Sequence, residues 1–349
     1  MKGVTTPRRS SHRAEVTGRW RDDQGVTLAL VAAALIVLTG AAALTIDLGN
    51  GWRTRQSLIP ATDSGALAAA QDIVDGLSGA SACTTAQNYV GQNSPGAVNV
   101  TCVTPFPTYH SSDQGQVTVT ADHNVQTWFA ASVGSGDYTV TSASTAVFGP
   151  PATVTRLRPM ALCVEANSDI ENAVNSPPAP GSSIVTTVFY DDGDCADSED
   201  GNMGRIDFDG SGDYEEWVLD GYPEPVSFGN DWAGSCSSES HCYPGEARAL
   251  SGSLNSELNS LENSGIYFAM PVFDYADGDY NAEFHLMGIL RVRLIDHKVY
   301  GSESSRFLKM EIKPGLIAGT CCGPAYGASG NKVTTICAVD VGDYDACDP

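Results

Sequence analysis

The hydrophobic pattern of the chain begins with one long apolar run that has no polar face. Residues 26–46 are 21 successive positions without a charged side chain, and the polar side chains among them are Thr27, Thr39 and Thr45. A helix of about 20 apolar residues spans the hydrocarbon core of a bilayer. Since Ala and Leu favour helix, the Ala-rich residues 61–74 (ATDSGALAAAQDIV) predict that this helix continues as a stem.

The apolar run has three interpretations at this stage. A retained anchor fits its length, because the apolar part of a secretion signal is usually only about 7–15 residues long. The small residues of AAALT, residues 41–45, imitate a signal cleavage site and keep a secreted form as an alternative. Gly25 follows basic residues and precedes the run, which is the arrangement at which prepilins are cut. The length favours the retained single-pass anchor.

Beyond the stem, apolar and polar residues alternate, which is typical of half-buried strands. The segments with this alternation are NVTCVT, QVTVTAD, HNVQTWFA and YTVTSASTAVF, between residues 99 and 148. They predict a small antiparallel sheet that rests on the stem helix. The Pro-containing segment GPPATVTRLRP, residues 149–159, is predicted to be a linker.

From Met160 onward the pattern is mixed. IVTTVFY, IYFAMPVFDY and NAEFHLMGILRVRLIDHKVY are rich in β-branched and aromatic residues, whereas GEARALSGSLNSELNSLEN, residues 245–263, favours a helix. The whole chain is therefore predicted to have an α+β fold. Its parts are a basic cytoplasmic segment (1–25), a transmembrane helix (26–47), a stem helix with a small β domain (48–149) and an exported, disulfide-rich α+β domain (150–349).

Charge and cysteine usage give this arrangement a direction across the membrane. Residues 1–25 carry six Lys or Arg against three Asp or Glu, whereas the whole chain has a net charge of −23. By the positive-inside rule, the N-terminus stays in the cytoplasm and the bulk of the chain is exported to the cell envelope. All ten cysteines follow the apolar run, which predicts disulfides in an oxidising compartment. The acidic balance argues against nucleic acid as a partner.

Two disulfides are suggested by position. Cys83, at the end of the helical region, and Cys102, in the first predicted strand, would tie helix to sheet. Cys236 and Cys242 are close enough in sequence to close a short local loop. Both bridges would have a structural role, which is the usual one for exported cysteines.

The acidic segment DFDGSGDYEEWV, residues 207–218, copies the opening of a calcium-binding loop. Oxygen-bearing side chains occupy its first, third and fifth positions and glycine its sixth, as in an EF-hand loop. The candidate metal ligands are Asp207, Asp209, Ser211, Asp213 and Glu215. The twelfth position is Val218, which cannot supply the closing bidentate carboxylate. The alternative is an acidic turn that caps a helix starting near Tyr214.

No sequence motif for catalysis or nucleotide binding occurs, neither G-x-S-x-G, H-E-x-x-H, a P-loop nor G-x-G-x-x-G. His123 and His285 lie in strand-like segments, where a packed and hydrogen-bonded histidine is expected rather than a base. Acidic residues are abundant, but nothing singles out the pair that hydrolysis would need. The sequence predicts a protein that is not an enzyme and has no cofactor apart from the calcium hypothesis.

Several of these features occur together in one known family. A glycine, an apolar span, Asp-x-Gly, Arg-Gln and an Asp-containing Ala run follow one another at Gly25, Asp47, Gly49, Arg55, Gln56, Asp63 and Ala66 to Ala70. A later segment matches at Gly201, Asn202, Gly204, Asp207, Asp209, Gly210, Gly221, Tyr222, Pro225, Val226 and Ser227. On these residues the chain resembles the TadE/TadG-like proteins of the Tad (tight adherence) pilus-assembly family, and its exported region resembles that of the actinobacterial type.

The resemblance implies a structural function in the assembly or anchoring of a Tad/Flp-type pilus. Its partners would be the membrane and other pilus or secretion-system components. One alternative is a calcium-dependent surface adhesin that shares the anchor. A secreted hydrolase is the third hypothesis.

The predicted orientation can be tested by a fusion. A reporter that is active only outside the cytoplasm, joined after Pro349, should be active, because the basic segment stays inside and every cysteine is exported. A reporter that requires the cytoplasm, joined at the same position, is the control. Activity of that control alone would contradict the orientation and the disulfide argument together.

Overall fold

The computed structural model describes residues 19–104, 115–134, 136–190, 201–209, 214–229, 236, 241–246, 250, 252–277, 282–321 and 330–337. The chain divides into two compact units. Unit 1 comprises Met1–Thr54 and Asn124–Val140, and unit 2 comprises Arg55–His123 and Thr141–Pro349. The α+β fold predicted from the sequence, with its long N-terminal helix, antiparallel sheets and disulfides, is confirmed.

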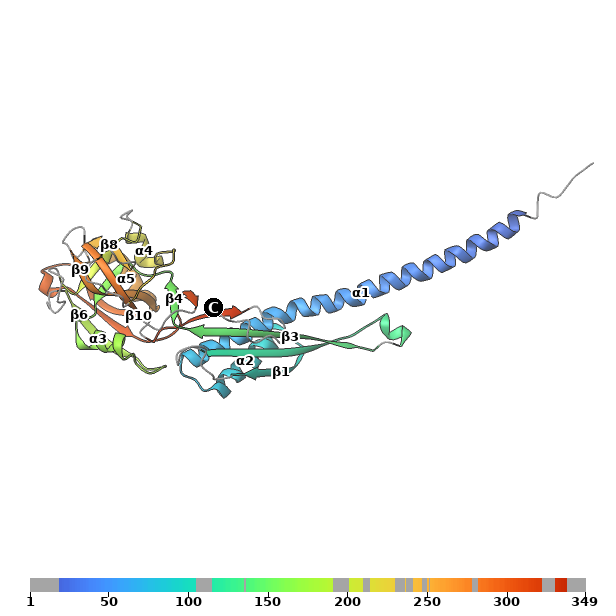
Figure 1. Cartoon of the computed structure of the whole chain (residues 1–349), viewed down its shortest axis with the longest axis horizontal. Coiled ribbons are helices and arrows are strands. Elements are labelled where there is room, and N and C mark those ends of the chain that lie inside the picture. The colour runs from blue at the N-terminus through green and yellow to red at the C-terminus, as the bar shows by residue number, and fades with distance from the viewer. Residues whose placement is uncertain are drawn as a thin grey trace, which may run out of the picture. The chain divides into compact units, whose positions relative to one another are not determined.

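Unit 1 consists of the first part of α1 (Arg19–Val74) and the end of the hairpin formed by β2 (Gly115–Val125) and β3 (Tyr138–Gly149) (Figure 1). The helix contains one segment that is long and apolar enough to cross a membrane. From Val26 to Leu48 its side chains are exposed, except for the partly covered Ala43 and the buried Asp47. The exposed apolar surface fits a membrane anchor, and a signal sequence would have the same composition.

Unit 2 begins with the rest of α1, which continues without interruption through Pro60 to Val74. Small side chains such as Ala61 and Ala66 are buried along it, so that other elements approach closely. The helix α2 (Gly79–Asn93) approaches α1 closely at Gly65, because a Cβ on Gly65 would lie 2.9 Å from a methyl group of Val90. The hydroxyl groups of Thr62 and Ser142 are also hydrogen-bonded, which joins α1 to β3.

The sheet beside this part of α1 has four strands in the order β1-β2-β3-β13, in which β1 pairs antiparallel with β2 and β13 pairs antiparallel with β3. The first is β1 (Ala97–Val103), and the last, β13 (Val333–Cys337), comes from near the C-terminus. Thr334 of β13 lies opposite Phe148 in the register with β3. A late segment thus completes the sheet, which the local alternation of residues 99–148 could not predict.

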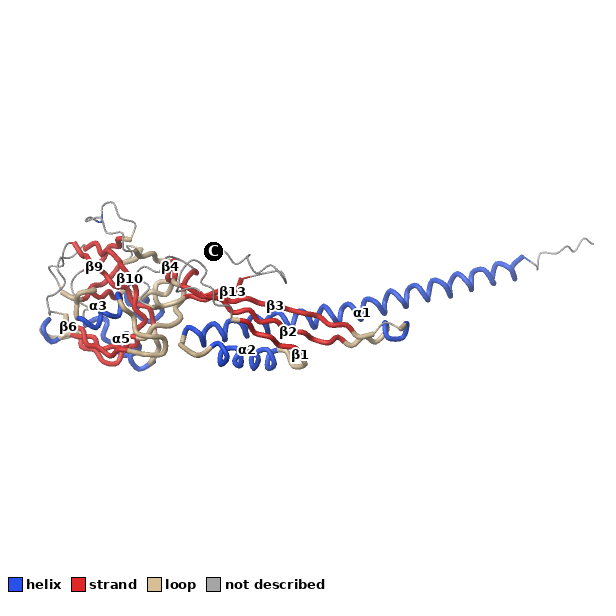
Figure 2. Tube along the Cα trace, turned by 60° about the horizontal axis from the view of Figure 1, so that its bottom comes forward, coloured by secondary structure: helices blue, strands red, loops and turns tan. Residues whose placement is uncertain are grey.

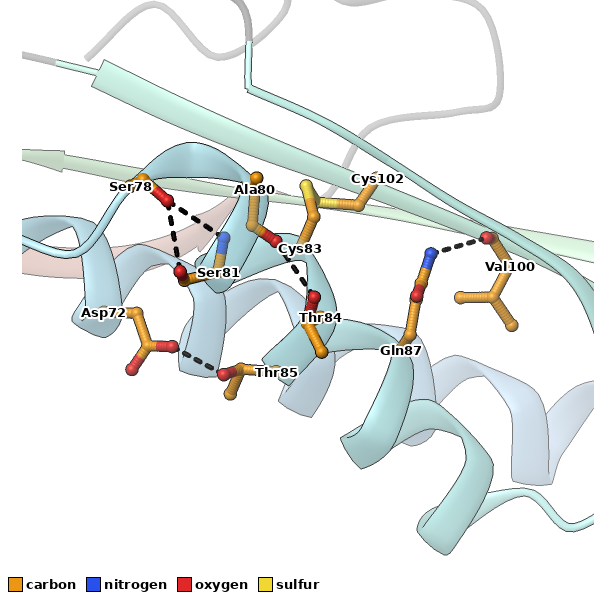
Figure 3. Close-up of a disulfide and its surroundings, with 10 residues drawn as sticks. All are labelled: Asp72, Ser78, Ala80, Ser81, Cys83, Thr84, Thr85, Gln87, Val100 and Cys102. Atoms are coloured by element: carbon orange, nitrogen blue, oxygen red, sulfur yellow. Dashed lines mark hydrogen bonds between the residues drawn. A yellow bond between two sulfur atoms is a disulfide. The ribbon is translucent and has the colours of Figure 1, made fainter.

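The predicted Cys83–Cys102 disulfide is present and ties α2 to β1, with 5.4 Å between the Cα atoms (Figure 3). Around it, the Ser78 hydroxyl oxygen accepts a hydrogen bond from the amide N–H of Ser81 at the start of α2. Thr85 of the same helix donates its hydroxyl hydrogen to the carboxylate of Asp72 in α1 (Figure 3). The two helices and the edge strand are therefore fixed by covalent and polar contacts together.

The remainder of unit 2 is built on a seven-stranded sheet with the order β6-β11-β10-β8-β7-β5-β9. Figure 2 shows β6, β9 and β10 of this sheet. Its strands are β5 (Met160–Cys163), β6 (Ile184–Phe189), β7 (Met203–Ile206), β8 (Cys242–Glu246), β9 (Phe268–Asp277), β10 (Ala282–Lys298) and β11 (Phe307–Ile312). Because β9 pairs with both β5 and β10, the strands β9, β10, β8, β7 and β5 close into a ring.

Helices cover this ring and short strands border it. α3 (Ser168–Asn175) contacts β6 and β10, and α5 (Asn255–Ser264) contacts β10 and α4 (Tyr214–Asp220). α5 follows the 3₁₀ turn Gly252–Leu254, and a further 3₁₀ turn, Glu303–Ser305, precedes β11. A two-stranded sheet pairs β4 (Pro151–Val154) with β12 (Gly319–Cys321). The buried apolar residues of all these elements form one core.

Phe284 lies in this core at the point where three strands meet. It is fully buried, and its ring packs edge-on against Phe273 with 5.0 Å between the centroids. Gly204 of β7 and Gly245 of β8 leave room for this ring, because a Cβ on either glycine would lie within 2.8 Å of it. The strands can close into their ring around Phe284 because β7 and β8 have no side chain at this contact.

Two of the local predictions were wrong. The segment 149–159 is no free linker, because β4 lies within it and Val154 and Leu157 are fully buried. The helix predicted for residues 245–263 begins only at Asn255. Residues 245–246 instead belong to β8, where Gly245 pairs with Ala282 of β10. In both places a tertiary strand pairing overrides the local pattern.

Replacing Phe284 by Ala should lower the free energy of unfolding by about 3–5 kcal/mol, because it opens a cavity at the strand junction. The matched control is Phe189→Ala in β6, whose ring is partly exposed and contacts Phe307 in a tilted arrangement. Its cost should be less than half as large. Urea unfolding of both variants measures the difference, and equal losses would contradict the place assigned to Phe284.

Candidate functional site

The acidic segment is the first candidate site, and the structure describes it in part. Asp207 and Asp209 follow β7, and the Asp207 N–H donates to the carbonyl of Pro244 at 2.8 Å. Ser211 and Asp213 lie outside the described residues, and of Glu215 only the backbone in α4 is described. The calcium hypothesis therefore stays a prediction, since three of its five ligands have no described side chain.

An aromatic cluster lies beside this acidic segment. Phe208 stacks on Tyr222 with 5.0 Å between the ring centroids, and Trp217 of α4 contacts both rings. Burial raises the pKa of the Tyr222 hydroxyl, and the nearby negative charges, of which Asp209 has the largest effect, raise it further. Within the described part of the chain, no three His, Cys, Asp or Glu side chains are grouped to hold a metal ion. The helix α4 spans Tyr214–Asp220, and the residues directly before it, on which the capping alternative depends, lie outside the described residues.

His285 was expected to be a packed, hydrogen-bonded histidine, and this is confirmed. Its side chain is fully buried, and its Nδ1 lies 2.6 Å from a carboxylate oxygen of Asp274 on the neighbouring strand β9. His297 at the far end of β10 pairs in the same way with Glu262 of α5. The two pairs join β10 to β9 and to α5, so these histidines support the fold.

The densest polar contact in unit 1 is made by Asp47, which is 5 % exposed. One carboxylate oxygen accepts the N–H of Trp128 at 3.0 Å, and the other accepts the N–H of Ala130 at 2.7 Å. The N–H of Phe129 lies between them, at 3.2 and 3.4 Å from the two oxygens. These three residues lead into the short 3₁₀ helix η1 (Ala130–Val133) at the end of the β2–β3 hairpin. Asp47 therefore caps a helix that lies about 80 residues further along the chain.

The neighbouring residues hold the same two segments together. The amide of Asn50 donates to the Gln126 carbonyl at 3.2 Å, and the Tyr138 hydroxyl donates to the Asp47 carbonyl at 3.2 Å. Gly51 leaves room for this hydroxyl group, because a Cβ there would lie 1.7 Å from the Tyr138 hydroxyl oxygen and the tyrosine side chain would have to move. We call this set of contacts, formed by Asp47, Asn50, Gly51, Trp128 to Ala130 and Tyr138, the Asp47 clasp.

A hollow of about 540 Å³ runs along α1 next to the clasp. Its lining is formed by Ile36, Thr39, Gly40, Ala43, Leu44, Asp47, Phe129 and Ala130. The helical members recur every three or four residues, so they lie on one face of α1. Phe129 and Ala130 of the hairpin thus lie beside the apolar segment of the helix as well as beside Asp47.

The local sequence pattern does not predict the clasp. HNVQTWFA was predicted to be a strand throughout, but β2 ends at Val125, and the backbone N–H groups of residues 128–130 bind Asp47 instead of a neighbouring strand. In the sequence, Asp47 stands at the outer end of the apolar run. A buried carboxylate there needs hydrogen-bond donors, which was the available signal, but nothing local identifies residues 128–130 as those donors.

Comparison with known proteins gives this chain no relative: no protein-family model, no curated protein and no solved structure matches it. The resemblance to TadE/TadG-like proteins therefore rests on the residues quoted above and stays a prediction.

The clasp predicts a specific loss of protection in the hairpin. Replacing Asp47 by Ala leaves the N–H groups of Trp128, Phe129 and Ala130 without their acceptor, so their hydrogen exchange should become faster. The matched control is Asp72→Ala, which removes a carboxylate of the same helix that binds Thr85 in unit 2. Hydrogen exchange is measured by mass spectrometry on peptides covering residues 126–134 in both variants, and only the Asp47 variant should exchange faster. Unchanged exchange in the Asp47 variant would show that the clasp does not hold the loop.

Proposed function

We propose that the chain is a retained, single-pass membrane protein with a cytoplasmic N-terminus, and that its exported part acts structurally in the assembly or anchoring of a Tad/Flp-type pilus. The assignment of α1 as a membrane anchor is supported by the exposure of its apolar part. None of its most apolar window is buried within the protein. Such a surface in water would be highly unfavourable, whereas lipid chains cover it at no such cost.

Retention of the span, rather than cleavage, is supported by the hollow beside α1. A cut near AAALT would remove residues such as Ile36, Thr39 and Gly40, which line the hollow with Phe129. The helix also continues without a break through this segment into unit 2. The span thus has contacts with the folded part of unit 1, which a discarded signal would not need.

The proposed orientation is supported by the charges and the disulfides. The basic residues 1–25 lie on one side of the span in sequence. The Cys83–Cys102 and Cys236–Cys242 disulfides lie on the other side, and Cys163 and Cys321 are disulfide-bonded as well. Disulfides persist in oxidising compartments, so this side is assigned to the outside of the cytoplasmic membrane.

The structural role is supported by the contacts of the residues on which the resemblance is based. Asp47 holds the hairpin, and Asp63 accepts a hydrogen bond from the Ser144 hydroxyl of β3. The side-chain amide of Asn202 donates to the Phe189 carbonyl at 3.1 Å, and Gly204 makes room for Phe284. Each of these residues maintains the fold rather than forming a reactive centre, which favours an assembly component over a hydrolase.

The proposal is tested in cells that lack the chain. The full chain should restore surface pili, counted by electron microscopy. A version in which residues 1–46 are replaced by a cleavable secretion signal should not restore them, because it has no anchor. Normal pili in cells without any form of the chain would contradict the assembly role. If such cells instead lost calcium-dependent attachment, the adhesin alternative would replace it.

The same cells provide the mature protein for N-terminal sequencing. A protein that resists alkaline extraction from membranes and begins at or near Met1 is expected. A start at Val26 would indicate prepilin-type processing, and a start near Thr45 would make the chain a secreted protein.

A further inference from the structure

The end of the β2–β3 hairpin has an unusual composition for this chain. Residues 124–136 contain no charged side chain, although Asp and Glu number 42 in the whole sequence. Trp128 is 66 % exposed and Phe129 is 43 % exposed. Large aromatic side chains at the tip of a loop are unfavourable in water, and they are frequent where proteins contact the membrane interface. We call residues 126–134 the hairpin tip.

The hairpin tip lies at the level where the apolar segment of α1 ends. Asp47, the first charged residue after the span, binds three of its N–H groups. Phe129 and Ala130 also line the hollow that extends back along α1 to Gly40 and Ile36. Since a helix rises 1.5 Å per residue, Gly40 is roughly 10 Å from Asp47 along the axis, on the side of the span. The tip therefore borders the segment that lipid would surround.

Several backbone N–H groups of the tip are hydrogen-bonded to other groups of the protein, so they do not need water as a partner. The N–H groups of residues 128–130 are bound by Asp47, and the N–H of Thr127 donates to the Asp137 carboxylate at 2.9 Å. The Gly134 N–H donates to the Ala131 carbonyl at 3.2 Å. Irregular backbone is costly in a bilayer when its polar groups lack partners. In the hairpin tip, protein groups satisfy these donors.

A second exposed tryptophan lies on the helix itself. Trp52, which is 65 % exposed, follows Asp47 by five residues on α1. Tryptophan favours the headgroup region because its ring is apolar and its N–H is polar. Unit 1 thus has two exposed tryptophans from segments far apart in sequence, Trp128 within the clasp and Trp52 next to Gly51 of the clasp.

We propose that the hairpin tip is a second membrane contact, in which Trp128 and Phe129 insert into the outer headgroup–acyl boundary of the bilayer that α1 spans. The inference rests on the proposed membrane anchor and adds a lipid-binding element to it. With the tip inserted, the clasp fixes the exported hairpin at a defined depth, whereas a single helix would leave it free to turn. The occupant of this surface is lipid, and not a second copy of the chain.

The test uses the full chain reconstituted into phosphatidylcholine vesicles whose acyl chains are brominated near the headgroup, since bromine quenches tryptophan at contact. Replacing Trp128 by Phe should reduce the share of the tryptophan fluorescence that the brominated lipid quenches. The matched control is Trp217→Phe, which removes a tryptophan buried in unit 2 and should leave the quenched part unchanged. Trp52→Phe serves as the reference for an interfacial tryptophan on the anchor itself.

The outcomes separate the inference from the proposed function. If the protein stays in the vesicles and Trp52 is quenched while Trp128 is quenched only by acrylamide in the water, the tip is solvent-exposed and the inference fails, although the anchor stands. Protection of Trp128 from both quenchers would mean that another protein surface, such as a second copy, covers the tip, and this also contradicts the inference. Loss of the protein from the vesicles on alkaline washing would contradict the anchor itself.

Discussion

The arrangement of unit 1 depends on how one carboxylate is satisfied. Asp47 ends the apolar segment of α1 and is buried, so its oxygens need donors from the protein. They obtain them from the three N–H groups that lead into η1. Both partners would be unfavourable alone, since a buried carboxylate and three free N–H groups each lose hydrogen bonds to water. Their pairing links the end of the helix to the end of the hairpin.

Unit 2 is stabilised in a different way. Its core is a closed ring of strands around Phe273 and Phe284, which requires Gly204 and Gly245 at the contact. Disulfides and buried His–carboxylate pairs then join neighbouring elements, such as His285 with Asp274. Exported domains commonly combine an apolar core with disulfides in this manner. The two histidine–carboxylate pairs of this unit thus contribute to the fold.

Several features of the fold could be predicted because their signal is local. The apolar run, the Ala-rich stem and most of the alternating strand segments depend on periods of a few residues, and they reappear as α1, β1, β2 and β3, whereas residues 126–130 of HNVQTWFA do not form a strand. The Cys83–Cys102 disulfide was predictable from the elements that carry its cysteines. The acidic segment at Asp207 and Asp209 was also recognisable by spacing, whereas metal binding depends on side chains that the described residues include only in part.

By itself, the sequence determined that the chain has a membrane-compatible helix, an α+β fold and structural disulfides, since composition and short periods decide these. The tertiary structure alone decided that β13 completes the first sheet, that β9 closes the ring and that Asp47 binds residues 128–130. Each of these contacts joins residues far apart in the chain. Their partners are selected by the packing of whole elements, because a single N–H group or strand edge has no sequence signature that identifies what it will meet.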